Sequence, residues 1–341
     1  MTSDLGTSSR TDQAARPDTG PARGRAGRAP RLVLAAALLL ALVAVPFVVP
    51  SDAANLLSRI LAFALLAVSL DLLVGVGGMP SLGHAAPFGV GAYVAGITAK
   101  ELTALAPVQL VAAAVAGAVF SALVGWLIVR VRGTYFLMLT LAVAELARTA
   151  ADQWDQVTGG SNGLVGIPAI QVVPGGGPLL LAGFRYWYVL AVAALGFGLI
   201  VAISRSAFGR SLRGIRDNED RMASLGYSTF RVKFTAFVLA GAFAGAAGSL
   251  WTVQSRFVSP ADLGFNVSAM ALLAVVIGGR GRLWGAILGA ALVIFIRDEV
   301  GAQLGGRGPL LLGITFIAVV YLLPRGFAGL RLHRPGRKDP A

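Results

Sequence analysis

The chain has 341 residues, of which 56% are hydrophobic and 13% are charged, and its formal net charge is +13. Soluble domains carry roughly a quarter charged residues, so this composition excludes an ordinary soluble protein and indicates a membrane protein. The absence of cysteine excludes disulfide frameworks, thiolate metal sites and thiol nucleophiles. The arginines cluster between apolar runs, which the positive-inside rule explains better than a nucleic-acid partner does.

The N-terminal region predicts a tail followed by a first span. Residues 1–30 are polar and rich in Arg, Pro, Gly and Ser, so we expect a disordered, basic cytoplasmic tail. The apolar run at 31–50 is long enough for the ~30 Å hydrocarbon layer. A signal-peptide core is the alternative, but no convincing small-x-small cleavage site follows it, so we expect a retained helix.

Apolar segments recur along the chain and predict an all-α, polytopic transmembrane bundle of about ten spans within residues 31–325. The expected spans are 31–50, 56–76, 85–99, 107–129, 134–151, 186–204, 233–254, 263–278, 283–300 and 309–323. The segment at 85–99 is short for a full crossing, so a broken or re-entrant helix is the alternative there.

Charge predicts the orientation of these spans. Ten spans place both termini and the basic loop at 205–233 in the cytoplasm, as the positive-inside rule requires, with residues 326–341 as a second basic tail. Removing one span would move the loop or the basic C-terminal end outside. The Gly- and Pro-rich segment at 152–185 is then external, and it is too short to bury a core, so we expect a partly ordered cap.

The loop at 205–233 has the most informative pattern. On a helical wheel, about half the circumference is apolar and the charges occupy the rest. The apolar positions are Phe208, Leu212, Ile215, Met222, Ala223 and Leu225. We predict a short amphipathic helix that docks a cytosolic motor, and a solvated charge run is the alternative.

Three other segments bear on a passage. The glycines in 75–93 interrupt one helix and keep the next one thin. They either expose backbone groups to a passage or permit close helix packing. His84 in this segment is a lone histidine, which suits packing or gating. In 131–154, Glu145 and Arg148 either form a structural pair or face a passage. The string at 278–290 has the small-x-x-x-small spacing of packed helices.

Six strings, in one order across most of the chain, resemble the branched-chain amino acid ABC importer permeases, and in particular the longer, LivM-like member of the permease pair. The strings are SLGHAA with FGVGAY (81–93), RGTYFLMLTLA (132–142), TGGSNGL with GIP (158–168), an FGR.LR.IRDNE.RA-like string (208–223), LGY.TFR.K (225–233) and GGRGRLWG (278–285).

The resemblance implies a permease subunit in the bacterial inner membrane rather than an enzyme. It implies a second homologous permease, two cytosolic ABC ATPases, an extracytoplasmic solute-binding protein and membrane lipid as partners. The chain has no Gly-x-x-x-x-Gly-Lys phosphate loop, so ATP is used by the partner subunits and no cofactor or metal is expected in this chain.

Particular residues are expected at the coupling site and along the passage, and the resemblance itself carries over Asn218, Glu219, Ala223, Leu225 and Gly226 as the signature of importer permeases. Those expected to couple to the ATPase are Arg213, Arg216, Asn218, Glu219, Arg221, Ala223, Leu225 and Gly226. Those expected along the translocation path are Asp71, Gly78, Ser81, His84, Tyr93, Tyr135 and Glu145. The chain departs from the family at Pro87, where a bulky apolar residue is common, at Asp71, where Asn is common, and at 220–222, where Glu-Ala-Ala is best.

Branched-chain amino acids are the expected cargo, and urea, short-chain amides or another small amino-acid-like solute are the alternatives. A stand-alone secondary transporter would predict inverted repeats, and no clear repeat is present. An intramembrane enzyme would have few candidate groups, since the chain has two histidines and no His-Glu-x-x-His string.

Overall fold

The computed structural model describes residues 42–44, 46–47, 50–172, 179, 181–303 and 308–322, and these residues are helical apart from connecting segments and two isolated β-bridges. The chain divides into units 1–44 and 45–341, and in the first only the helical residues 42–44 are described. The features below belong to the second. Most of the expected span at 31–50, and both predicted tails, lie outside the described residues.

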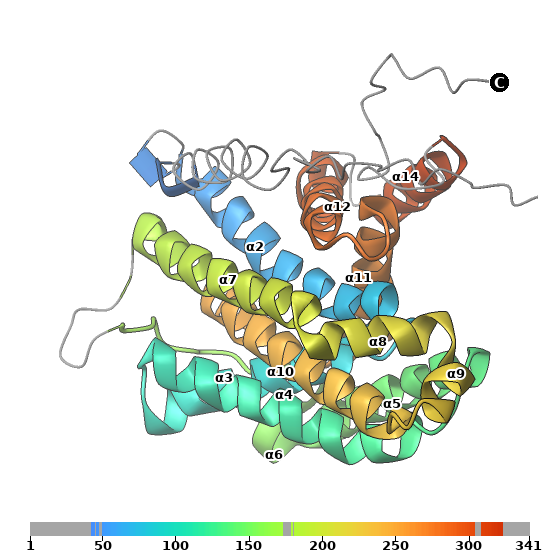
Figure 1. The fold of residues 1–341 in the computed structure, drawn as a ribbon. Coiled ribbons are helices and arrows are strands. Elements are labelled where there is room, and N and C mark those ends of the chain that lie inside the picture. Colours follow the sequence, from blue (N-terminus) through green and yellow to red (C-terminus); the bar gives the residue numbers. More distant parts are fainter. Residues whose placement is uncertain are drawn as a thin grey trace, which may run out of the picture. The chain divides into compact units, whose positions relative to one another are not determined.

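Each of the other expected spans coincides with a helix (Figure 1). These are α2 (Ser51–Asp71), α3 (Ala85–Ile97), α4 (Ala106–Ile128), α5 (Thr134–Gln153), α7 (Ala182–Arg205), α10 (Thr229–Ser255), α11 (Phe265–Gly278), α12 (Leu283–Phe295) and α14 (Gly308–Leu322). Three π-helical segments extend α2 to Val76, α3 to Leu102 and α12 to Val300.

Within the described residues, five helices are long and apolar enough to cross a membrane by themselves. They are α2 with its extension, α4, α5, α7 and α10. The all-helical prediction is confirmed, whereas the count of ten spans and the cytoplasmic termini stay predictions.

Helix α2 forms the centre of the unit. It packs against α7, α10, α11 and α12, and every residue from 62 to 77 is buried. A helix that is apolar all round belongs in the interior of a bundle. Helix α10 packs beside it and also contacts α3 and α4, meeting α4 along Gly117, Gly241 and Gly245, where small residues let the two backbones approach closely.

The predicted helix break between α2 and α3 is present, and most of it packs against protein, although Gly78 is exposed. Residues 77–84 are not helical, and hydroxyl groups from neighbouring helices bind the backbone there. Leu82 N donates to Thr140 Oγ1 at 3.2 Å, and Ala85 N donates to Ser268 Oγ at 2.9 Å. Irregular backbone is tolerated at membrane depth when protein satisfies its polar groups in this way.

The bundle has two distinguishable ends. One end carries the loop between α7 and α10, the start of α5 and the α11–α12 turn. The ion pair between Arg132 and Glu219 joins the loop to the start of α5, and the hydrogen bond from Gly281 N to Asp71 joins the turn to α2. We name residues 206–228 the basic elbow and this side the elbow end. The opposite side, the far end, carries the segment 154–172, which is bridged to the α10–α11 connection at Leu164 and Val258.

Candidate functional site

The basic elbow is two helices, so the predicted amphipathic helix is present as far as Asp217, and its continuation to Leu225 is wrong. Helix α8 (Ala207–Asp217) is followed at Asn218 by extended backbone with φ of −160° and ψ of 100°, and α9 (Glu219–Ser224) begins after it. Asn218 Oδ1 accepts a hydrogen bond from Arg221 N at 2.9 Å. An asparagine side chain that caps a new helix offers the backbone an alternative to continuing the old one.

The two elbow helices differ in burial. Leu212 and Ile215 of α8 are buried against the bundle, whereas no residue of α9 is buried. Leu225 and Tyr227, which follow α9, are 65% and 48% exposed. The segment 220–228, which we name the elbow tip, therefore extends apolar side chains beyond the bundle.

The root of the elbow is braced by ion pairs. Glu219 contacts Lys233 of α10 at 2.8 Å and Arg132 before α5 at 3.2 Å, and Arg132 also contacts Asp220 at 3.1 Å. The Lys233 side chain is only 8% exposed, so this contact is partly desolvated. Asn218 and Glu219 thus support the elbow, while Arg221, Ala223, Leu225 and Gly226 lie on its exposed tip.

A joint connects α8 to the central helix. Arg216 Nη1 donates to the carbonyl oxygen of Gly75 at 2.6 Å, and the Arg216 side chain packs against Gly78. Asp71 Oδ1 accepts a hydrogen bond from Gly281 N of the α11–α12 turn at 2.8 Å. Two candidate path residues, Asp71 and Gly78, therefore lie at this joint, where the glycines permit close packing.

The other candidate path residues lie at different depths. Ser81, His84 and Tyr93 are buried among packed helices, and His84 Nε2 lies 2.8 Å from Ser69 Oγ. Tyr135 is 75% exposed on the first turn of α5, and Glu145 lines a cavity. The structure does not bring the seven candidate path residues together.

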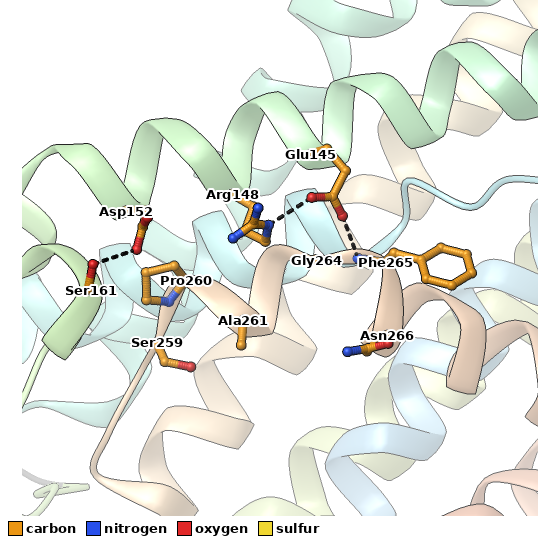
Figure 2. Close-up of a pocket in the computed structure, with 10 residues that line it drawn as sticks. All are labelled: Glu145, Arg148, Asp152, Ser161, Ser259, Pro260, Ala261, Gly264, Phe265 and Asn266. Atoms are coloured by element: carbon orange, nitrogen blue, oxygen red, sulfur yellow. Dashed lines mark hydrogen bonds and ion pairs between the residues drawn. The ribbon is translucent and has the colours of Figure 1, made fainter. Parts of the chain in front are cut away.

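The cavity measures about 490 Å³ and lies on the side of α5 that faces the start of α11 (Figure 2). Its lining residues are Glu145, Arg148, Asp152, Ser161, Ser259, Pro260, Ala261, Gly264, Phe265 and Asn266. Arg148 Nε donates to Glu145 Oε2 at 2.7 Å, and Phe265 N donates to Glu145 Oε1 at 3.1 Å. Asp152 Oδ1 accepts a hydrogen bond from Ser161 Oγ at 2.9 Å.

The Glu145–Arg148 pair predicted from spacing is present. The wall of the cavity that faces this pair could not be predicted from the sequence. The wall comes from the short 3-10 turn Pro260–Leu263 and the start of α11. Asp262 rigidifies this turn by accepting a hydrogen bond from Ser259 N at 2.8 Å. Burial raises the pKa of Asp262 above its ordinary value, and the hydrogen bonds from Ser259 oppose that rise.

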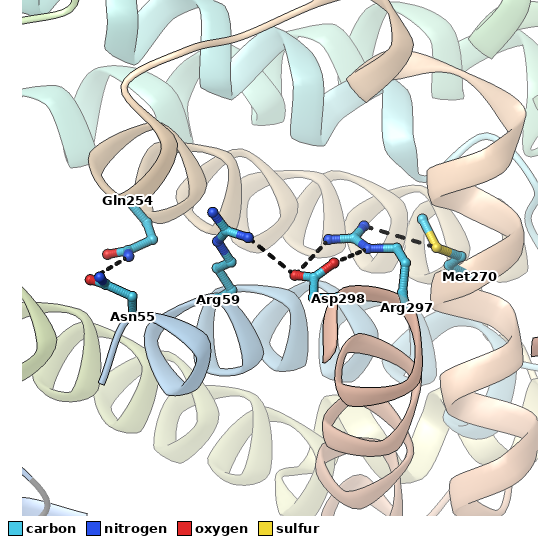
Figure 3. Close-up of polar contacts among 6 residues, drawn as sticks. All are labelled: Asn55, Arg59, Gln254, Met270, Arg297 and Asp298. Carbon is cyan, nitrogen blue, oxygen red and sulfur yellow. Dashed lines mark hydrogen bonds and ion pairs between the residues drawn. The ribbon is translucent and has the colours of Figure 1, made fainter. Parts of the chain in front are cut away.

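A second polar cluster at the far end was missed by sequence reasoning (Figure 3). We name it the far-end clasp. Asp298 accepts hydrogen bonds from Arg59 at 3.3 Å and from Arg297 at 2.6 Å, and the Arg297 guanidinium lies over the Trp251 ring at 5.4 Å. The clasp joins α2, α10 and the π-helical end of α12. In the described residues no group of three His, Cys, Asp or Glu side chains is placed to hold a metal.

Comparison with known proteins decides the family. A family model described as the branched-chain amino acid transport system / permease component matches residues 53–322. The chain belongs to this family. The permease is thus a multi-pass integral membrane protein, and the resemblance carried by the six strings is confirmed.

Individual relatives of the permease include LivM, the high-affinity branched-chain amino acid transport system permease protein of Escherichia coli (strain K12). The two are 30% identical over 333 residues, which cover 90% of this chain and 76% of LivM. LivH of the same strain is 26% identical over 285 residues, covering 78% of this chain and 91% of LivH. No solved structure matches the chain.

A shorter match extends to another transport system. LsrC, the autoinducer 2 import system permease protein of Klebsiella pneumoniae, is 35% identical over 120 residues, which cover 35% of this chain and 34% of LsrC.

Proposed function

We propose that the permease is a membrane subunit of an ATP-driven ABC importer in the bacterial inner membrane. With a second, homologous permease it forms the translocation path for branched-chain amino acids, which an extracytoplasmic binding protein delivers to the far end. Two cytosolic ATPases dock at the elbow end. The observation that carries this proposal is the elbow, whose root is braced by Glu219 while Leu225 and Tyr227 extend from its tip.

Charge supports the assignment of the elbow end to the cytoplasm. Arg132 and the elbow itself lie there, as do Arg280 and Arg282 of the α11–α12 turn, which contacts Asp71. Basic residues accumulate in cytoplasmic loops of membrane proteins. An ATPase uses cytosolic ATP, so its docking site must lie on that side.

The joint at Arg216 supports a mechanism. When ATP binding closes the ATPases, the elbow moves, and α8 carries the motion to α2 through Gly75 and to the α11–α12 turn through the adjacent Asp71. Rigid-body rocking of the spans then opens the path to one side or the other. The ATPases shift this equilibrium because they bind the two states with different affinities.

The names of the relatives support the cargo. LivM and LivH, which each match most of this chain, are named for branched-chain amino acids. LsrC matches about a third of the chain and is named for autoinducer 2, so related sequence serves another solute. Urea, short-chain amides or another small amino-acid-like solute are the alternative cargoes within the same importer class.

The elbow tip provides the test. In proteoliposomes containing both permeases, both ATPases and the binding protein, Leu225→Asp is expected to lower ATP-driven leucine uptake roughly tenfold or more, because a buried charge weakens an apolar contact by at least ~1.4 kcal/mol. Leu225 is exposed in the permease itself, so its folding should change little. Leu225→Met, which keeps an apolar side chain of similar volume at the same position, is the matched control.

Two results would contradict the proposal. One is wild-type uptake by the Leu225→Asp complex with ATPase still bound. The other is uptake that persists when the ATPases are left out, which would indicate a secondary transporter.

A further inference from the structure

We propose that the α5 cavity is a subsite for a zwitterionic α-amino acid, in which Arg148 binds the carboxylate and Asp152 binds the ammonium group. The inference rests on the proposed function and names the residues that recognise the cargo. Glu145, Arg148 and Asp152 follow one another along one face of α5, toward the start of α11 (Figure 2). Their charges alternate as negative, positive and negative.

Arg148 is positioned to bind an anion. Its Nε is occupied by Glu145, and among the described residues its two terminal nitrogens donate to no protein acceptor. A guanidinium fork binds a carboxylate through two parallel hydrogen bonds. Gly264 leaves room for this side chain, since a Cβ at that position would lie 3.0 Å from Arg148 Cδ.

Asp152 supplies the opposite charge one helical turn further on. Ser161 holds its Oδ1, and among the described residues Oδ2 has no hydrogen-bond donor. Four residues along a helix correspond to about 6 Å of rise. An α-amino acid carries its ammonium and carboxylate groups on the same Cα, so one molecule can contact both side chains at ordinary ion-pair distances.

The remaining walls suit an aliphatic side chain. Pro260, Ala261 and Phe265 contribute apolar surface opposite α5, and the volume of about 490 Å³ falls within the usual range of small-molecule sites, roughly 300–1,000 Å³. Ionisable groups on a membrane helix are costly unless they face protein, water or a charged partner. A neutral cargo such as urea would bring no opposite charge to the terminal nitrogens of Arg148 or to Asp152 Oδ2, which favours the zwitterion.

Glu145 is a positioning residue in this arrangement. It fixes the Arg148 side chain through Nε and anchors itself on Phe265 N, so the free edge of the guanidinium stays toward the cavity. Its carboxylate already neutralises part of the Arg148 charge, which keeps the cargo from binding too tightly to leave.

The test uses the complete complex with its binding protein in proteoliposomes. Arg148→Gln and Asp152→Asn are each expected to lower the maximal rate of leucine uptake at least tenfold, while stimulation of ATP hydrolysis by the loaded binding protein persists. Asp155→Asn, at an exposed acidic position outside the cavity lining, is the matched control and should transport normally.

A second readout separates recognition from stability. Leucine bound to the purified complex without binding protein should be displaced by added leucine. Leucinamide, which has no carboxylate, and N-acetyl-leucine, which has no ammonium, should each displace it at least tenfold less well. Arg148→Gln should remove the difference between leucine and leucinamide. If that variant does not assemble, Asp152→Asn with N-acetyl-leucine decides the question.

Uptake at the wild-type rate by both variants, or equal displacement by all three probes, would overturn the subsite while leaving the importer intact. A wild-type complex that shows no ATP-driven leucine uptake at all would instead overturn the proposed function.

Discussion

Gly78 and Gly226 show how two residues with similar backbone angles carry different constraints. Their φ angles are 68° and 86°, a region that costs other residues about 1–2 kcal/mol. A Cβ on Gly226 would meet no atom within 4 Å, whereas a Cβ on Gly78 would run into the Arg216 side chain. Gly226 therefore serves a turn, and Gly78 also serves the joint that connects the elbow to α2.

We expect Gly78→Ala to destabilise the permease more than Gly226→Ala, whose cost should stay near the backbone strain of about 1–2 kcal/mol. Gly198→Ala is the control, because α7 is helical there and the new methyl group meets no atom within 4 Å; it should be neutral or stabilising by up to ~1 kcal/mol. Thermal unfolding of the purified variants measures all three. Equal losses at positions 78 and 226 would show that Arg216 does not pack against Gly78.

At the scale of elements, the Asp298 carboxylate in the far-end clasp joins α2 to the π-helical end of α12, and Arg297 extends the clasp to α10 through the Trp251 ring. Asp298 is 16% exposed and binds both Arg59 and Arg297. Removing Arg59 leaves Asp298 paired, but removing the charge of Asp298 leaves two guanidiniums without their partner. The stability of the clasp should therefore depend more on Asp298, at the end of α12, than on Arg59 of α2.

The prediction is that Asp298→Asn lowers the free energy of unfolding by about 1–3 kcal/mol, as expected for lost hydrogen bonds to a charged group. Arg59→Gln should cost less than ~1 kcal/mol, because the Arg59 side chain is 44% exposed. When Arg59→Gln is already present, adding Asp298→Asn should lower the free energy of unfolding by less than Asp298→Asn does in the otherwise wild-type protein. A larger loss for Arg59→Gln than for Asp298→Asn would contradict this account of the clasp.

At the scale of the whole molecule, the decisive property is sidedness. The basic elbow and the Arg132 contact lie at one end, and the cavity lining at Asp152 and Ser161 lies toward the other. The importer proposal requires the elbow end to face the cytosol. It also requires the far end to face the binding protein.

The chain has no cysteine, so single cysteines report sidedness without background. A membrane-impermeant maleimide should label Val165→Cys in intact spheroplasts and Tyr227→Cys in inverted vesicles. If residues 31–50 span the membrane, Ser8→Cys in the predicted tail should be labelled in inverted vesicles, as Tyr227→Cys is. Labelling of Tyr227→Cys from outside would exclude a cytosolic partner at the elbow.

Local patterns predicted what local forces control. Long apolar runs indicated α2, α4, α7 and α10, since burial in lipid or in a bundle requires little more than hydropathy and length. The i, i+3 spacing of Glu145 and Arg148 predicted a pair that one helix suffices to form. The helical wheel placed Leu212 and Ile215 correctly on the buried face of α8 but failed beyond Asp217, because it assumes a continuous helix and Asn218 interrupts it.

The sequence by itself thus determined the family, the main helices, the position of the basic elbow and one ion pair. Only the tertiary structure decided the contacts between distant segments: Glu145 with Phe265, 120 residues away, Asp71 with Gly281, 210 away, and Arg59 with Asp298, 239 away. Such contacts depend on how far each helix is rotated and shifted against its neighbours. Packing of many side chains sets that rotation, and the hydropathy of a single helix does not encode it.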